Sequence, residues 1–299
     1  MIELRHYRYI VAVERAGGFS RAALALGIST PTLSVQVKYV EDLLGAPIFE
    51  RTSQKLSVTT SGREFIKAAR DVLAAAAAAE EIGRYAARGE AGKVFVGYVG
   101  SAAYGGTLQR IVSAFRQRFP RAVVIAAEYQ IEELPVMVES RSIDFALVRA
   151  PLAPGAAELR KIGLTDDSHV VALSSDHPLA ATPDLPIEAG ELADSRFVVP
   201  EQFTYGTNEL ARRGGFVVNV QSVQRTLIGV LTQVSLGGCA AIVPGAVSSS
   251  VLMPGVVFRE LAGDPILSGI VGLYRRDEAS PLVRNFLDVV GALERAVGG

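Results

Sequence analysis

Apolar residues recur at helical spacing in three short segments at the start of the chain, residues 4–14, 21–26 and 30–44. Each segment is followed by glycine, the residue that most often ends a helix. We expect Ser20 to cap the second segment and Thr30 to cap the third, with Pro31 in its first turn. Two helices joined by a short turn containing glycine predict a helix-turn-helix motif.

The third segment divides into an apolar face and a polar face. Leu33, Val37, Val40 and Leu44 share one face, which we expect to be buried. The opposite face presents short polar and cationic side chains of the kind that enter a DNA major groove. The alternative is an ordinary solvated helix face. The residues of the opposite face, with Ser34 at its edge, are Pro31, Thr32, Val35, Lys38 and Tyr39.

Residues 56–59 predict a short strand, and with residues 51–55 they predict a small basic hairpin carrying Arg51 and Lys55. Such a wing beside a helix-turn-helix favours DNA contact by the polar face of residues 30–44 over the alternative of an ordinary solvated surface. A capping box at residues 61–64 then opens a helix to about residue 88 that contains six consecutive alanines. We interpret this helix as a dimerising linker rather than a low-complexity stretch, with a hinge at residues 89–92.

After residue 92 the pattern alternates between strands and helices. This βαβαβ order is typical of a doubly wound parallel sheet, and about 200 residues is large for one sheet, so we expect two lobes with a cleft. The expected strands are 94–99, 123–128, 145–148, 170–173, 197–199, 217–220, 241–243, 256–260 and 270–274, and the expected helices are 108–119, 131–139 and 281–296.

Composition narrows the functional classes. The 299 residues carry 30 Lys and Arg against 31 Asp and Glu, but residues 1–67 hold nine of these cations and six of these acids, which gives the front a charge of +3 and the remainder −4. The net positive charge of residues 1–67 has the sign expected for a segment that contacts an anion. No apolar run approaches the roughly 18–20 residues of a membrane span, and no signal peptide is evident at the N-terminus. The single Cys239 excludes a disulfide framework and fits the cytoplasm, and we expect it to be a buried apolar residue.

The chain resembles the LysR-type transcriptional regulators from residue 4 to residue 62, and its later organisation is similar to theirs. The resemblance implies a winged helix-turn-helix domain (1–58), a linker helix (59–89) and an α/β two-lobed effector domain like a type 2 periplasmic binding protein (90–299). Lobe I would span about 92–161 and 267–299, and lobe II about 162–266. The segments that carry the resemblance are Leu4-Arg5-His6-Tyr7, Gly18-Phe19-Ser20-Arg21-Ala22-Ala23, Leu33-Ser34, Gln36, Leu44-Gly45-Ala46-Pro47-Ile48-Phe49-Glu50-Arg51 and Thr59-Thr60-Ser61-Gly62.

The resemblance implies binding to double-stranded promoter DNA, a small-molecule effector, a homodimer or homotetramer, and contact with RNA polymerase. Thr30 and Val35 depart from the family pattern, which usually has Gln and often Arg there, so the operator preference is expected to differ. Our hypothesis is that Val35 packs on an apolar base edge such as a thymine methyl. The expected DNA-binding residues are Ser20, Arg21, Thr30, Pro31, Thr32, Ser34, Val35, Lys38, Arg51 and Lys55.

The glycine-rich stretch 97–106 is not a nucleotide-binding fingerprint. It is either a tight strand-to-helix turn or an anion site, and the resemblance favours effector binding by Ser101. Arg149 is either a salt-bridge partner or a pocket residue, and Phe203 either stacks on the ring of an effector or is a core residue.

Residues 128–131 lack the Ser or Thr that the family often has after the second strand. This departure favours a monocarboxylate or a less acidic aromatic or aliphatic effector over a diacid. The expected effector-binding residues are Gly100, Ser101, Ala102, Gln130, Ile131, Arg149 and Phe203.

No nucleophile and base constellation stands out, and the three histidines are scattered, so we expect no enzyme activity, no metal and no cofactor. His169 is placed either near Asp166 and Asp167 in the cleft or, as we expect, at the surface. Two rival classes share an α/β body. A solute-binding protein would carry a signal peptide and no helix-turn-helix, and a dehydrogenase would carry a dinucleotide fingerprint.

Overall fold

The computed structural model describes residues 1–51, 56–152, 158–181, 185–201 and 204–297. Within them the chain forms two compact units, Met1–Tyr85 and Ala86–Gly299. None of the described helices combines the length and the apolar character needed to cross a membrane.

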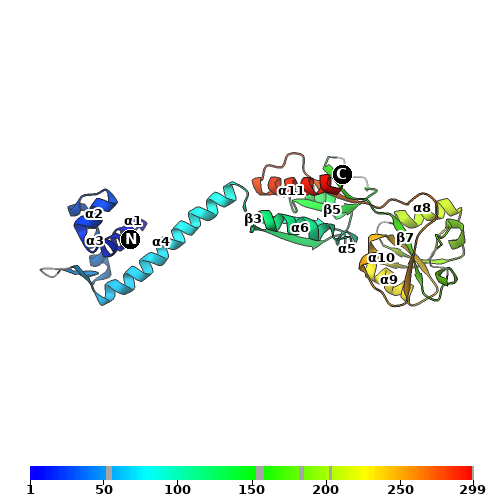
Figure 1. Cartoon of the computed structure of the whole chain (residues 1–299), viewed down its shortest axis with the longest axis horizontal. Coiled ribbons are helices and arrows are strands. Elements are labelled where there is room, and N and C mark those ends of the chain that lie inside the picture. Colours follow the sequence, from blue (N-terminus) through cyan, green and yellow to red (C-terminus); the bar gives the residue numbers. More distant parts are fainter. Residues whose placement is uncertain (52–55, 153–157, 182–184, 202–203, 298–299) are drawn as a thin grey trace. The chain divides into compact units, whose positions relative to one another are not determined.

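The first unit is a three-helix core with a two-stranded hairpin and a long helix, shown in blue to cyan in Figure 1. The two hairpin strands are antiparallel, with Phe49 opposite Val58. The expected helix-turn-helix, hairpin and long helix are therefore all present. The elements are α1 Leu4–Ala16, α2 Phe19–Leu26, α3 Thr30–Leu44, β1 Phe49–Arg51, β2 Leu56–Val58 and α4 Thr60–Ala87.

The buried face of α3 is the expected one except at its last turn. Leu33, Val37 and Val40 are each at most 2% exposed and pack with residues of α1, α2 and β1. Leu44 is 42% exposed, contrary to expectation, because the core cluster ends at Val40 on this helix and the last turn extends beyond it. The helix stops at Gly45, whose positive φ of 69° is a conformation that glycine adopts without strain.

The helix caps differ from those expected. The hydroxyl of Ser29, not Thr30, caps α3, because it accepts the Thr32 N–H at 3.1 Å. Helix α2 begins at Phe19 after Gly18, and no side chain caps it, so Ser20 lies inside the helix. In both helices the regular conformation starts earlier than expected, which moves the cap towards the N-terminus.

Helix α4 begins at Thr60 and is capped by Thr59, whose hydroxyl accepts the Gly62 N–H at 2.8 Å. The expected capping box at residues 61–64 is therefore wrong, because the helix starts two residues earlier and the Ser61 hydroxyl donates to the Pro47 carbonyl instead. A Cβ at Gly62 would lie 2.2 Å from the Ile48 carbonyl oxygen, so the helix start and the hairpin approach closely here only because glycine has no side chain.

The second unit has two sheets, each the centre of one lobe. Lobe I has the strand order β4-β3-β5-β12-β6, in which β3 is parallel to β4 and β5 while β12 is antiparallel to β5 and β6. Helices α6 and α11 pack with this sheet (Figure 1). Its elements are β3 Ala91–Tyr98, α5 Ser101–Tyr104, α6 Thr107–Arg118, β4 Arg121–Glu128, α7 Glu133–Glu139, β5 Phe145–Arg149, β6 Arg160–Thr165, β12 Ile270–Tyr274 and α11 Pro281–Val297.

Lobe II has the strand order β11-β7-β10-β8-β9, in which β8 is parallel to β9 and β10 while β7 is antiparallel to β10 and β11. Its core contains the expected buried Cys239, which is 1% exposed. Its elements are β7 His169–Ser174, η1 Pro178–Ala181, η2 Ala189–Leu192, β8 Arg196–Pro200, α8 Tyr205–Gly214, β9 Asn219–Gln224, α9 Leu227–Ser235, β10 Ala240–Pro244, α10 Ala246–Ser250 and β11 Val256–Arg259.

The chain crosses between the lobes twice, after β6 and before β12, and this explains why the sheets are mixed rather than wholly parallel. The two crossovers pair through an antiparallel bridge between Ser168 and Leu267, and the Ser268 N–H donates to the Asp167 carbonyl at 2.7 Å. The returning β12 enters the lobe I sheet antiparallel to β5. Lobe I also includes β6 as far as Thr165, a few residues past the boundary near residue 161 that the sequence predicts.

Candidate functional site

The face of α3 opposite the core is open to solvent. Val35 is 63% exposed, as its helical position predicts, and Pro31, Thr32 and Lys38 are also exposed. Ser34 and Thr30 are half-buried at the edges of this face. The Thr32 hydroxyl lies 2.7 Å from the Ser29 hydroxyl, so the helix cap also orients it. This face has the polar, short side chains that a groove-reading helix needs.

Lys38 forms an ion pair with Asp42 one turn further along α3, at 2.9 Å between Nζ and Oδ1. Both side chains are more than 60% exposed, and the hydrogen bond from the ammonium to Asp42 raises the pKa of Lys38. Exposed pairs of this kind are weak. A phosphate that approaches Lys38 therefore competes with the Asp42 carboxylate for the ammonium group.

Buried His6 connects the first helix to α3. The Glu3 N–H donates to His6 Nδ1 at 2.9 Å, so Nδ1 is an acceptor and Nε2 carries the proton. Nε2 then donates to the Gln36 Oε1 at 2.8 Å. This bond fixes the side chain of Gln36 on α3. No local pattern predicts this pair, because the two residues lie 30 positions apart.

The remaining expected DNA-binding residues lie on α2 and on the hairpin. Ser20 and Arg21 are exposed on α2, and the Arg21 guanidinium donates to the Gly17 carbonyl at 3.1 Å. Arg51 ends β1, opposite Leu56. The Arg51 side chain and all of Lys55 lie outside the described residues.

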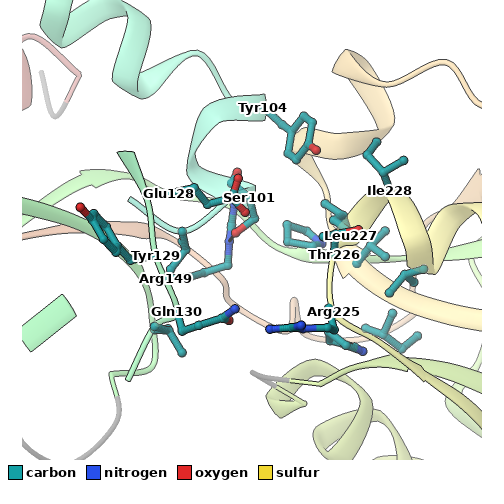
Figure 2. Close-up of a pocket in the computed structure, with 18 of the residues that line it drawn as sticks. Ser101, Tyr104, Glu128, Tyr129, Gln130, Arg149, Arg225, Thr226, Leu227 and Ile228 are labelled. Carbon is teal, nitrogen blue, oxygen red and sulfur yellow. Dashed lines mark hydrogen bonds between the residues drawn. The ribbon is translucent and has the colours of Figure 1, made fainter. Parts of the chain in front are cut away.

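A cavity of about 400 Å³ lies between lobe I and lobe II (Figure 2), within the range of small-molecule pockets. Lobe I contributes the ends of β3, β4 and β5 together with α5, and lobe II contributes the start of α9 and the end of β10. The lining residues are Val99, Gly100, Ser101, Tyr104, Glu128, Tyr129, Gln130, Ile131, Arg149, His169, Pro200, Arg225, Thr226, Leu227, Ile228, Val230, Ile242, Val243 and Pro244.

Arg149 lies at the base of this cavity and is only 2% exposed. Its Nε donates to the Ser101 hydroxyl at 3.0 Å, and its Nη2 donates to the Ser101 carbonyl at 3.1 Å. Its Nη1 donates to Asp167 at 2.8 Å and to both oxygens of Ser268. These bonds occupy at least four of the five N–H groups of the guanidinium. Burial lowers the pKa of Arg149, and the Asp167 carboxylate opposes that effect.

Asp167 belongs to the first crossover between the lobes and binds groups from both of them. One of its oxygens accepts the Arg149 guanidinium of lobe I, and the other accepts the Ala246 N–H at the start of α10 in lobe II, at 3.2 Å. Arg149 is thus both a salt-bridge partner and a residue of the cavity wall, the two alternatives that the sequence leaves open. The pair lies at the crossovers through which one lobe would move relative to the other.

Glu128 ends β4 and directs its carboxylate toward the glycine-rich turn before α5. Its Oε1 lies close to Gly100, at the position that a Cβ on this residue would occupy. Figure 2 shows the Glu128 side chain beside Ser101. Burial raises the pKa of the Tyr104 hydroxyl, and the charge of Glu128 raises it further.

His169 is buried in the cavity wall and 4% exposed, so its expected surface position is wrong. It begins β7, a strand covered on both faces, and its Nδ1 donates to the Ile266 carbonyl at 3.1 Å. Burial lowers its pKa. A Cβ on Gly206 would lie 2.6 Å from the imidazole, which shows how closely α8 packs on this ring.

The structure brings five of the seven expected effector-binding residues into the cavity wall: Gly100, Ser101, Gln130, Ile131 and Arg149. Ala102 is instead fully buried in the lobe I core, because it is the second residue of α5 and points away from the cavity. Phe203 lies outside the described residues.

The sequence prediction missed the lobe II wall formed by residues 225–228. Arg225 is 79% exposed and lies 3.4 Å from the Glu201 carboxylate at the rim. Thr226 caps α9, because its hydroxyl accepts the Gly229 N–H at 3.1 Å. A threonine followed by an apolar run was the available signal for this helix start.

The described part of the chain holds no group of three or more His, Cys, Asp or Glu side chains arranged to bind a metal ion. Cys239 donates from Sγ to the Gln233 carbonyl at 3.4 Å, and burial raises the pKa of its thiol. A buried thiol of raised pKa is unreactive.

Two family models match the chain. Residues 4–63 match the bacterial regulatory helix-turn-helix protein of the lysR family, and residues 87–294 match the LysR substrate binding domain. The first match covers the α1 to α4 region that carries the α3 face, and the second covers both lobes and the cavity between them.

Curated relatives and solved structures agree with these matches. The HTH-type transcriptional regulator BudR of Raoultella terrigena is 30% identical over 96% of this chain and 100% of its own. The Hca operon transcriptional activator HcaR of Escherichia coli K12 is 28% identical over 97% of each chain. The crystal structure of full-length CbnR with its target DNA has a TM-score of 0.78 at 22% identity, covering 98% of this chain and 100% of that one. The crystal structure of full-length BenM has a TM-score of 0.59 at 22% identity, and the match covers 99% of this chain and 97% of BenM.

Proposed function

The chain belongs to the LysR family of bacterial transcriptional regulators, and we propose that it reads promoter DNA with the exposed face of α3 under the control of a small organic molecule bound between its lobes. It is a DNA-binding transcriptional regulator rather than an enzyme. Its expected place of action is the cytoplasm, where promoter DNA is found.

The observation that carries the DNA-reading proposal is the division of α3 into two faces. Leu33 and Val37 fix the helix on the core, while Thr32 and Val35 on the other side are exposed. A helix fits the major groove, which is about 12 Å wide, and short side chains there contact base edges. Lys38, together with Arg51 and Lys55 of the hairpin, is assigned to phosphate contacts.

Regulators with a helix-turn-helix bind successive major grooves as paired subunits, with half-sites about one helical turn apart. Helix α4 supports such pairing, because it carries exposed apolar side chains that a second copy would cover, among them Val72 at 39% and Ile82 at 61% exposure. A homodimer or homotetramer is therefore part of the proposal, and so is contact with RNA polymerase at the promoter.

The effector is proposed to be a small aromatic or aliphatic compound, because apolar side chains form much of the cavity wall. The sequence favoured an organic acid or an aromatic compound. The bonds that already occupy the Arg149 guanidinium support the aromatic or aliphatic alternative over carboxylate pairing with this residue. A ligand that binds one arrangement of the lobes more tightly shifts the population toward it.

The DNA-reading proposal is tested by fluorescence anisotropy with the DNA immediately upstream of the chain's own gene and a shuffled duplex of equal composition. We expect tighter binding to the upstream DNA and a fall in affinity between about 50 and 200 mM salt. The Lys38→Gln variant should weaken binding to both duplexes and lower the salt slope by about one unit. Lys93→Gln, which removes an exposed lysine of the second unit, is the matched control. Equal affinity for the two duplexes would overturn the proposal.

A further inference from the structure

Of the residues that the structure describes, three charged side chains line the cavity between the lobes, and two of them already have a partner of opposite charge. Arg149 lies 2.8 Å from Asp167, and Arg225 lies 3.4 Å from Glu201. The third is Glu128. Among the described residues no Lys, Arg or His nitrogen lies within 4 Å of its carboxylate. The paired groups cancel, so the cavity wall carries one uncompensated negative charge.

This charge lies at the end of β4, the edge strand of the lobe I sheet. Glu128 is the last residue of β4, and its carboxylate passes over Gly100, where a Cβ would collide with Oε1 at 2.4 Å. The carboxylate is exposed to the cavity and lies beside Ser101 in Figure 2. A ligand that reaches Ser101 therefore also meets Glu128.

A ligand carboxylate is a poor match for this position. It would lie close to the like charge of Glu128, and like charges in a partly enclosed site repel each other. Arg149 also lines the cavity, but this side chain is 2% exposed and at most one of its N–H groups is available. An anion at this position would therefore gain at most one N–H from Arg149 while the Arg149–Asp167 pair stays intact.

The rest of the wall suits the apolar body of a cationic ligand. Leu227 and Ile228 at the start of α9 face the lobe I residues across the cavity (Figure 2). Tyr104 belongs to the lobe I wall near Glu128, and the face of such a ring attracts cations. The effect of Glu128 on the Tyr104 hydroxyl shows that the charge acts within this part of the cavity.

We propose that the effector is an organic amine, whose protonated ammonium group pairs with the Glu128 carboxylate while its apolar body packs against the α9 wall. This inference rests on the proposed function, because it names the ligand class of the same cavity. An alkylammonium group is protonated at pH 7, since such amines have pKa values near 10, like lysine.

Isothermal titration calorimetry on the full chain at pH 7 tests the proposal with three ligands of the same shape and different charge: phenethylamine, 2-phenylethanol and phenylacetate. We expect wild type to bind phenethylamine most tightly and phenylacetate most weakly. Glu128→Gln should reduce the phenethylamine affinity by about tenfold and leave 2-phenylethanol nearly unchanged. Glu139→Gln, which neutralises an exposed carboxylate of the same lobe outside the cavity, should leave all three affinities unchanged.

Glu128→Lys provides a second variant, in which the order should reverse so that phenylacetate binds more tightly than phenethylamine. Phenylacetate binding wild type more tightly than phenethylamine would overturn the proposal. So would equal phenethylamine affinity in wild type and Glu128→Gln, or the absence of phenethylamine binding to wild type. Anisotropy of the ligand-free chain on upstream and shuffled DNA separates these results from failure of the regulator function, because that measurement does not involve the cavity.

Discussion

The Asp167 carboxylate lies 2.8 Å from the Nη1 of Arg149, and the two side chains are 14% and 2% exposed. The carboxylate also accepts the backbone N–H of Ala246 at 3.2 Å. A single ion pair thus joins the end of the central lobe I strand β5, the first crossover and the start of α10 in lobe II. Since Arg149 also binds Ser101 in the cavity wall, a ligand that moves Ser101 acts on the connection between the lobes.

Removing one partner of this pair is expected to destabilise the second unit. Asp167→Ala leaves the Arg149 guanidinium buried without its counter-ion, which costs about 3–5 kcal/mol. The free energy of unfolding in urea measures this loss. Asp277→Ala is the control, because Asp277 pairs with Arg141 at 3.4 Å on the surface and such pairs contribute less than about 1 kcal/mol. Similar losses in both variants would show that the Arg149–Asp167 pair has no special role in stability.

The stability of the second unit should depend on pH through His169. Burial lowers the pKa of the folded imidazole below its ordinary value of about 6.5, so the unfolded chain binds the proton first as the pH falls. The contribution of neutral His169 is therefore complete above pH 6.5 and is lost as the pH falls from there toward the folded pKa. His169→Asn keeps a donor for the Ile266 carbonyl and removes the titrating ring. We expect urea unfolding between pH 6.5 and 5 to show a shallower pH slope in this variant.

His177 is the comparison for that measurement, because burial also lowers its pKa but it lies outside the cavity wall. It is only half-buried, so His177→Asn should change the pH slope less than His169→Asn does. A slope that is unchanged in His169→Asn would contradict the assignment of the acid sensitivity to this residue.

The Ser29 cap should stabilise α3 and hence the DNA-reading face. Ser29→Ala removes the acceptor for the Thr32 N–H and should lower the free energy of unfolding of the first unit by about 1 kcal/mol, within a range of about 0.5–2. Ser57→Ala is the control, because the Ser57 hydroxyl makes only a 3.5 Å bond on the exposed hairpin. Differential scanning calorimetry would show the loss as a lower Tm. An unchanged Tm in Ser29→Ala would exclude a stabilising role for the cap.

Val35 should affect sequence preference and not stability. Its side chain is 63% exposed, so Val35→Ala creates no cavity in the core. If it packs on a thymine methyl, the variant should lose discrimination at one operator position by about 1 kcal/mol or more. Competition binding against operators substituted base by base measures this. Leu252→Ala, which truncates a 98% exposed side chain of the second unit, should leave the preferences unchanged. Identical preferences in wild type and Val35→Ala would contradict direct reading by Val35.

The helical first unit was predictable because its hydrophobic period comes from local spacing. Leu33 and Val40 face the core as the helical period requires, and the turn glycines end the helices where expected. The caps lie one or two residues earlier than predicted, in α3 because two adjacent hydroxyls, those of Ser29 and Thr30, both have capping chemistry. Local sequence does not determine which of them leaves the helical conformation.

Elements of the second unit were predicted less completely. Strand β6 was missed because only Leu164 of its six residues is buried, so it lacks the alternating pattern of a half-buried strand. Helices α8 and α9 were missed as well. Helix α9 begins with Leu227 and Ile228 and is rich in apolar residues, a pattern that periodicity does not distinguish from a buried strand.

The cavity was predicted in part. Ser101 and Arg149 follow strands of lobe I, and the carboxyl ends of parallel strands meet at one edge of a sheet, so their proximity follows from the βαβ order. The pairing of Arg149 with Asp167 and the burial of His169 depend on how the two crossovers pass each other. That arrangement arises from packing between segments about 100 residues apart, such as Ser168 and Leu267, and no local pattern encodes it.

DNase I footprinting on the DNA upstream of the chain's own gene tests the regulator account most directly. The account predicts protection of two half-sites whose centres lie about 10–10.5 base pairs, or a multiple of that spacing, apart on one face of the duplex. It also predicts that Val35→Ala changes which half-site variants are protected. Protection that spreads evenly along the duplex, or is absent at protein concentrations that protect a positive-control regulator on its own operator, would contradict the assignment of the α3 face to sequence-specific promoter recognition.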